Sequence, residues 1–360
     1  MATVRFRRTL KLLLGVFLAA GLLSASLIPA EAWQGTQKWV FTAKSSITGS
    51  PLVVGGKVII GDNEGNLYAL NANTGAQVWT FDTNSTINGA PAAAENTVFA
   101  GGTDGTLFAL NMANGAQRWK YTPKAANTPL GIWGSTETGG GMVYFNSFDG
   151  KVYAIRTSGG KPVWTYDTGR ELRSTPLYDN GVVYIGTYEG LFRALNAKTG
   201  KKIWGGGSGG PINSAAAVSN GVVYFGSWSG TIQAVKIKGV VPQWRYNAGE
   251  SITTAPVVSG GRVFFGTING KMVALNASTG QVAWEFPVPG GTHSTPAVSG
   301  SLLFFGSDGG VMYALDTATG QERWRFEITD DPGKGIVSSP AVANGVLYFG
   351  GQNGKVYAFQ

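Results

Sequence analysis

Short apolar segments separated by glycine-rich turns recur along almost the whole chain. In one segment of each unit the apolar residues follow one another without polar residues in between, as in Val222–Gly226 (VVYFG) and in Val263–Gly266 (VFFG). An uninterrupted apolar strand is buried on both faces. A sheet with one face in water does not provide such burial, whereas a sheet held between two neighbouring sheets does.

Each unit contains four such segments. In residues 173–204 the pattern predicts strands at Arg173–Leu177, Val182–Ile185, Leu191–Leu195 and Lys202–Trp204. The turns between strands contain Asn-Gly, Asp-Gly or Gly-Gly pairs, which supply the positive φ that tight hairpins need. We therefore predict units of four antiparallel strands.

Three landmarks repeat through the chain. A glycine stands at positions 65, 105, 150, 190, 230, 270, 310 and 354, an alanine follows each glycine after four residues, and in seven units a tryptophan follows the alanine after ten. Successive tryptophans are 40 residues apart, with one interval of 45 before Trp164. A repeat of about 40 residues made of strands and turns is typical of a propeller blade. The eighth unit ends at Gln360 without its tryptophan, but Gly35 and Trp39 reproduce the missing half at the other end of the chain.

The repeat therefore predicts an all-β fold. We expect an eight-bladed β-propeller of four-stranded antiparallel blades, closed by an N-terminal strand that completes the last blade, with residues 33–360 as one domain. A tryptophan at the same place in every unit is best explained by packing, with each indole docked across the seam between two blades. These blade-docking residues are Trp39, Trp79, Trp119, Trp164, Trp204, Trp244, Trp284 and Trp324.

The unit A-L-N-A-x-T-G-x-x-x-W is similar to the repeat of the pyrroloquinoline-quinone-type (PQQ-type) β-propellers, and the similarity covers residues 33–360. In size and in its lack of insertions the chain resembles the BamB-type proteins, which are non-enzymatic eight-bladed scaffolds that assist β-barrel assembly in the outer membrane. The resemblance implies a protein partner in the cell envelope and no cofactor. BamB-type proteins are usually lipoproteins, however, and this chain has no cysteine to acylate.

The same resemblance leaves an alternative open. Quinone-dependent dehydrogenases share the repeat and bind PQQ with calcium, but they are typically longer. Many place a disulfide of adjacent cysteines against the cofactor, and their calcium ligands come from insertions. This chain has no cysteine and no insertion longer than a few residues in its units.

The N-terminus reads as a secretory signal over residues 1–32. Arg5, Arg7, Arg8 and Lys11 form a basic region, Leu12–Leu27 is mostly apolar, and Ala30-Glu31-Ala32 is an A-x-A cleavage site. We expect cleavage before Trp33 and a monomer that is periplasmic or secreted, without a stable membrane anchor. An uncleaved anchor is the alternative, because the apolar run approaches the length that spans a bilayer. The absence of cysteine excludes disulfides and thiolate metal sites.

Charge and candidate chemistry point away from catalysis. Residues 33–360 contain 24 basic and 19 acidic side chains, a formal charge of +5, and the basic residues are scattered among the repeats, so we expect no nucleic-acid partner. His293 is the only histidine, and the adjacent pair Asp330-Asp331 is not followed by a calcium-binding loop motif. We expect no catalytic or metal-binding residues.

Positions that differ between units can serve a single site. The residues three positions before the proline of the first strand, or its equivalent, should lie at the mouth of the central channel. They are Thr48, Asn88, Trp133, Arg173, Asn213, Thr253, His293 and Val337. Asn88, Trp133, Arg173, Asn213, Thr253 and His293 are the candidate binding residues. The leading hypothesis is an exported scaffold that holds a protein partner, and the alternatives are a PQQ-dependent dehydrogenase and a small-ligand sensor.

Overall fold

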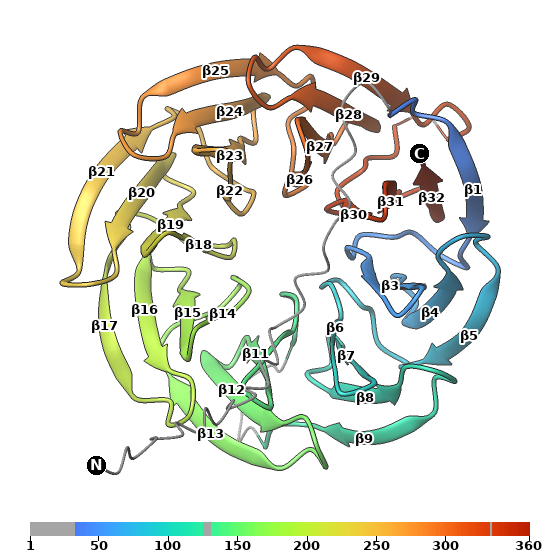
Figure 1. The fold of residues 1–360 in the computed structure, drawn as a ribbon. Helices are drawn as coiled ribbons and strands as arrows, with labels where there is room; N and C mark the ends of the chain where they lie inside the picture. Colours follow the sequence, from blue (N-terminus) through green and yellow to red (C-terminus); the bar gives the residue numbers. More distant parts are fainter. Residues whose placement is uncertain (1–32, 125–130, 332) are drawn as a thin grey trace, which may run out of the picture.

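The computed structural model describes residues 33–124, 131–331 and 333–360. These residues form a ring of eight four-stranded antiparallel sheets around a central axis (Figure 1), so the predicted eight-bladed propeller is confirmed. No helix occurs among them, and hence none long and apolar enough to cross a bilayer. The expected signal, residues 1–32, lies outside the described residues.

The strands follow one another from the inside of each blade to its outside, and we call them the inner, second, third and outer strands. Blade 1 consists of β2 (Leu52–Val54), β3 (Lys57–Gly61), β4 (Asn66–Asn71) and β5 (Gln77–Asp82), and blade 2 of β6 (Ala92–Ala94), β7 (Thr97–Gly101), β8 (Leu107–Asn111) and β9 (Gln117–Tyr121). Blade 3 consists of β10 (Glu137–Gly139), β11 (Met142–Ser147), β12 (Lys151–Arg156) and β13 (Pro162–Asp167), and blade 4 of β14 (Leu177–Asp179), β15 (Val182–Gly186), β16 (Leu191–Asn196) and β17 (Lys202–Gly207). Blade 5 consists of β18 (Ala217–Ser219), β19 (Val222–Gly226), β20 (Thr231–Lys236) and β21 (Val241–Asn247), and blade 6 of β22 (Val257–Ser259), β23 (Arg262–Gly266), β24 (Lys271–Asn276) and β25 (Val282–Pro287). Blade 7 consists of β26 (Ala297–Ser299), β27 (Leu302–Gly306), β28 (Val311–Asp316) and β29 (Glu322–Glu327), and blade 8 of β30 (Ala341–Ala343), β31 (Val346–Gly350), β32 (Lys355–Phe359) and β1 (Gln37–Thr42).

The hydrophobic core is divided among the seams between blades. Ile59 and Leu67 of blade 1, for example, pack with Val98 and Phe108 of blade 2 in one buried cluster. The second strands are buried on both faces, as their uninterrupted apolar runs predict.

The N-terminal strand closes the ring. β1 pairs antiparallel with β32, with Trp39 opposite Ala358, so the predicted closure is confirmed. Thr36 and Gln360 extend this pairing through two backbone N–H···O hydrogen bonds of 2.7 and 2.8 Å. The two ends of the described chain are thus held in one sheet (Figure 1).

The first predicted strand of the unit is placed wrongly. Arg173–Leu177 was the expected segment, but β14 begins only at Leu177. The hydroxyl groups before it make bonds that take the place of a β-ladder. Ser174 Oγ exchanges hydrogen bonds with the backbone N–H and C=O of Gly186, at 3.1 and 2.8 Å. These residues therefore approach the axis as a loop that side-chain hydrogen bonds hold.

Hydroxyl groups also join neighbouring blades around the axis. At the equivalent position in five of the eight blades, the backbone N–H donates to a Ser or Thr hydroxyl of the next blade at 2.8–3.0 Å. The five bonds run from Ala90 to Ser135, Ser135 to Thr175, Ala255 to Thr295, Thr295 to Ser339 and Ser339 to Ser50. Residues 90, 215 and 255 are alanines at this position, so they have no hydroxyl to accept the bond from the preceding blade. The small inner residues thus serve contact between blades.

The repeated tryptophans lie across the seams at the outside of the ring. Trp39, Trp79, Trp119, Trp164, Trp244 and Trp284 donate their indole N–H to a backbone carbonyl of the next blade at 2.8–3.1 Å. Each of these indoles covers a glycine in the turn between the third and outer strands of that blade. The six glycines have φ between 65° and 73°. A Cβ atom on any of them would lie 2.6–2.8 Å from the indole, so no side chain fits.

Blade 5 departs from this arrangement. The glycine position is occupied by Val240, with φ of 53°, a conformation that β-branched residues rarely adopt. Among the described residues the Trp204 indole donates no hydrogen bond to this turn, unlike the indoles of the blades on either side. The seam between blades 4 and 5 is therefore the least complete of those built on the repeat.

Replacing Val240 with glycine should stabilise the propeller by about 1 kcal/mol. The change removes a left-handed backbone strain of roughly 1–2 kcal/mol, and the greater freedom of glycine in the unfolded chain offsets part of that gain. Chemical unfolding of the propeller, followed by tryptophan fluorescence, measures the difference. The converse change in blade 4, Gly200→Val, is the control and should destabilise, because its Cβ would lie 2.7 Å from the Trp164 indole. A destabilising Val240→Gly would contradict this account of the seam.

Candidate functional site at the channel mouth

Two rings of residues surround one end of the channel. The mouth ring consists of the eight predicted positions, from Thr48 to Val337, in the loops that lead into the inner strands. The turn ring lies in the turns between second and third strands, two residues before each repeated glycine. Its members are Asn63, Thr103, Phe148, Tyr188, Trp228, Ile268, Asp308 and Gln352.

One backbone hydrogen bond per blade ties the two rings together. The N–H of each turn-ring residue donates to the carbonyl two residues before the mouth-ring residue of the same blade. In blade 4, for example, Tyr188 N–H donates to Glu171 O at 3.0 Å, next to Arg173. The same bond occurs in all eight blades, at 2.8–3.2 Å. Each blade thus presents a pair of neighbouring side chains at the mouth, and the sequence of the pair sets the local chemistry.

In blades 3 and 4 these pairs form a continuous aromatic series. Trp133 lies 5.4 Å from Phe148 between ring centroids, and the Arg173 guanidinium lies 6.0 Å from the Phe148 centroid and 4.6 Å from that of Tyr188. Tyr188 continues to Trp228 of blade 5 at 6.3 Å, edge to face. We call these five residues the aromatic crescent. Trp133, with 52% of its surface exposed, is the most exposed large apolar side chain of the two rings.

Charge and hydrogen-bonding capacity accompany the crescent. Arg173 Nε forms an ion pair of 2.7 Å with Glu171 Oε1, and both side chains remain well exposed. In blade 5, Asn213 Oδ1 and Trp228 Nε1 are buried and have no hydrogen-bond partner among the described residues. One is an acceptor and the other a donor, and buried polar atoms of either kind are normally hydrogen-bonded.

Most residues on the other side of the mouth are polar, although Ile268 is exposed there. Thr48 Oγ1 lies 2.8 Å from Asn63 Oδ1 and 3.1 Å from Asn88 Oδ1, which joins blades 1 and 2. Thr253 Oγ1 donates to the Thr292 carbonyl at 2.7 Å.

His293 and Asp308 form the pair of blade 7. His293 Nδ1 lies 2.7 Å from Asp308 Oδ2. This hydrogen bond raises the pKa of His293 above its ordinary value, against the opposing effect of burial. The histidine therefore gains positive charge at a higher pH than a free imidazole would.

The predicted site residues thus fall into separate groups. Trp133 and Arg173 come together through Phe148, and Asn213 flanks the far end of the crescent. Thr253 and His293 lie on other blades. Reasoning from the sequence missed Phe148, Tyr188 and Trp228. The signal was present, because the residue two before the repeated glycine is aromatic in three successive units and in no other.

The arrangement is suited to binding. The described residues contain no group of three His, Cys, Asp or Glu side chains that could hold a metal ion. Calcium takes six to eight oxygen ligands, including carboxylates. The described residues present no such set of carboxylates for the calcium that accompanies PQQ.

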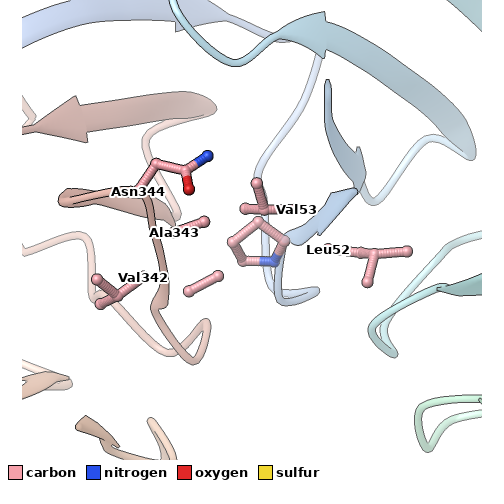
Figure 2. A pocket seen from close by; sticks show the side chains of 7 residues that line it. Leu52, Val53, Val342, Ala343 and Asn344 are labelled. Atoms are coloured by element: carbon pink, nitrogen blue, oxygen red, sulfur yellow. The ribbon is translucent and has the colours of Figure 1, made fainter. Parts of the chain in front are cut away.

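A small cavity lies away from the two rings, between the inner strands of blades 1 and 8. Its volume is about 200 Å³, and Leu52, Val53, Val342, Ala343 and Asn344 lie around it (Figure 2). Asn344 supplies its only polar side chain. Pockets for cofactors and drug-sized ligands usually measure about 300–1,000 Å³, so this cavity is a seam between blades.

Known structures resemble the chain over its whole propeller. BamB from Moraxella catarrhalis matches with a TM-score of 0.79 and 20% identity, over 91% of this chain and 100% of that one. The computationally designed Ika8 protein matches with a TM-score of 0.75 and 18% identity, over 91% and 98%. Quinohemoprotein alcohol dehydrogenase from Comamonas testosteroni matches with a TM-score of 0.72 and 16% identity, over 90% and 76%. At these identities the likeness establishes the fold alone.

Comparison at the level of sequence gives the family. No curated protein matches the chain. The family model described as outer membrane protein assembly factor BamB matches residues 17–129, 128–246 and 241–360. These segments cover far more than half of the sequence, and the chain therefore belongs to the BamB family of PQQ-type β-propellers.

Proposed function

We propose that this chain is an exported, non-catalytic scaffold that holds a protein partner across its channel mouth, in the assembly of outer membrane proteins. The observation that carries the proposal is the aromatic crescent. Trp133 and Arg173 are exposed, and Tyr188 is half-buried. Side chains that already contact one another lose little freedom when a partner covers them, and Trp, Tyr and Arg dominate interface hot spots.

Family membership supports the same function. The family is named for an outer membrane assembly factor, and a binding role needs no catalytic group. A periplasmic or secreted location follows from the expected signal and agrees with that role. The partner is a protein segment with apolar side chains to cover Trp133 and Phe148, and with a carboxylate to meet Arg173, which can bind one through two hydrogen bonds.

A photo-crosslinking residue in place of Trp133 tests the proposal in cells. It should form adducts with one envelope protein, whereas the same residue in place of Asn114, on the opposite face of blade 2, should form none of them. Binding of the purified propeller to that protein then gives the energetics. Trp133→Ala should weaken it by about 30-fold or more, as expected of a hot spot.

The double variant Arg173→Thr and His293→Thr separates binding from stability. Both side chains are exposed, so the free energy of unfolding should change by about 1 kcal/mol or less, while affinity should fall about ten-fold or more. Arg118→Thr, on the exposed outer strand β9, is the matched control and should leave affinity unchanged. Equal affinity of the double variant and the unaltered propeller would move the site away from the mouth.

A further inference from the structure

Basic side chains gather on the face opposite the channel mouth. They lie in and beside the turns between third and outer strands of blades 3, 4 and 5. This basic rim consists of Arg156, Lys161, Lys198, Lys201, Lys202, Lys236 and Lys238. All seven are exposed, and none forms an ion pair with another described residue. These residues are spread along the sequence, but the fold brings them onto one face of the molecule.

The clustering is specific to three neighbouring blades. The corresponding turns of blades 1, 2, 6 and 7, at residues 72–76, 112–116, 277–281 and 317–321, contain no lysine or arginine. β13, β17 and β21 are successive outer strands of the ring (Figure 1), so their turns adjoin. A shallow hollow lined by both Arg156 and Lys198 joins blades 3 and 4 directly. On the same face, the turns between inner and second strands of blades 2 to 4 contain two acidic residues, Asp179 and Glu95.

Exposed aliphatic side chains lie among the basic ones. Val163, Ile203, Val240 and Val241 are 38%, 52%, 39% and 48% exposed, and they belong to the same turns and outer strands. Val240 and Val241 stand at positions where other blades have Gly75 and Ala76, or Gly115 and Ala116. The rim therefore combines an unbalanced positive charge with apolar side chains at the outer edge of the molecule.

We propose that the basic rim binds an anionic lipid surface. Six of the seven charges are lysines on flexible stems with no fixed partners, which suits the diffuse field of lipid phosphates better than a single rigid ligand. The four aliphatic side chains can enter the boundary between headgroups and acyl chains. Such contact is reversible and differs from the stable anchor whose absence the sequence predicts. It leaves the mouth, on the opposite face, open to a protein partner.

Co-sedimentation of the propeller (residues 33–360) with vesicles tests the proposal. The propeller should bind vesicles of equal parts phosphatidylglycerol and phosphatidylcholine at low salt and should not bind phosphatidylcholine alone. Binding should disappear at about 1 M salt, where the Debye length is about 3 Å. Replacing Lys198, Lys201, Lys236 and Lys238 with glutamine should weaken binding by about 100-fold or more, at roughly five-fold for each lysine.

The matched control has the same change in charge elsewhere. It replaces the exposed Lys44, Lys120, Lys124 and Lys334 with glutamine and should keep most of the binding. Ile203→Asn should weaken binding while the charge stays constant, which a purely electrostatic contact would not show. Equal losses in the two quadruple variants, no binding to anionic vesicles, or a preference for a DNA duplex over vesicles would each overturn the proposal. Because no mouth residue is altered, failure here would leave the proposed function standing.

Discussion

Deleting residues 33–43 should lower the melting temperature of the propeller by 10 °C or more. The deletion removes β1, exposes the edge of β32, and takes away Trp39 and Trp33. Trp39 is buried among Tyr68, Tyr348 and their neighbours, and Trp33 lies 5.0 Å from Phe304 and 4.8 Å from Trp324. Loss of one buried tryptophan typically costs about 3–5 kcal/mol, and about 1 kcal/mol shifts the midpoint of a domain this large by roughly 2–4 °C.

Calorimetry of the shortened and intact propellers measures this effect. A synthetic peptide of residues 33–43, added in excess, should restore part of the stability, because the strand binds without a covalent link to the rest of blade 8. A peptide with Trp39→Ala is the matched control and should restore less. If the shortened propeller melted within error of the intact one, closure through β1 would have no energetic role.

Glu137→Gln should stabilise the propeller above pH 7 and leave it unchanged below pH 4. Glu137 is the one charged residue at its inner-strand position, where the neighbouring blades have Ala92 and Leu177. Burial raises the pKa of Glu137 to about 7, and a hydrogen bond from the Tyr178 backbone N–H opposes that rise only in part. Tyr178, stacked on Tyr144 at 5.7 Å, covers this region.

The sign of the effect follows from proton binding. Between the ordinary pKa of 4.5 and about 7, the folded chain holds a proton that the unfolded chain has lost, so stability falls as the pH rises through this window. At about 1.4 kcal/mol for each pH unit between these values, the loss is at most about 3.5 kcal/mol.

Denaturant unfolding at a series of pH values compares the two proteins. The unaltered propeller should lose stability between pH 4.5 and 7 relative to Glu137→Gln, and the difference should be constant above that window. Glu189→Gln, which removes an exposed carboxylate from a mouth turn, is the control and should follow the unaltered protein. A constant difference from pH 4 to pH 8 would show that Glu137 does not titrate in this window.

The propeller could be predicted from the sequence because its landmarks report packing that every blade shares. The spacing from glycine to tryptophan indicated the blades, and the missing eighth tryptophan indicated closure by Trp39. The inner strands were harder to predict, because hydroxyl hydrogen bonds such as that of Ser174 replace a ladder just where small polar residues suggest a strand.

The candidate site could be predicted only in part. The mouth ring follows from the repeat, so Trp133 and Arg173 were found. Their partners Phe148 and Tyr188 sit beside apolar strands, where an aromatic residue reads as ordinary core. The basic rim could not be found, because residues such as Lys161, Lys201 and Lys238 are about 40 positions apart and only the curvature of the ring brings their turns together.

Closure through β1 also sets the order in which the blades can fold during synthesis. β1 leaves the ribosome among the first residues of the propeller, whereas its partner β32 is the last strand of the propeller to be made. Blades 1 to 7 can pair their strands as they emerge, since domains tend to fold from the N-terminal side during synthesis. Blade 8 cannot. A chain that stopped before β32 would leave both β1 and β31 with open edges, which proteases and other chains can recognise. The ring can therefore close only after the last strand of the propeller has been made.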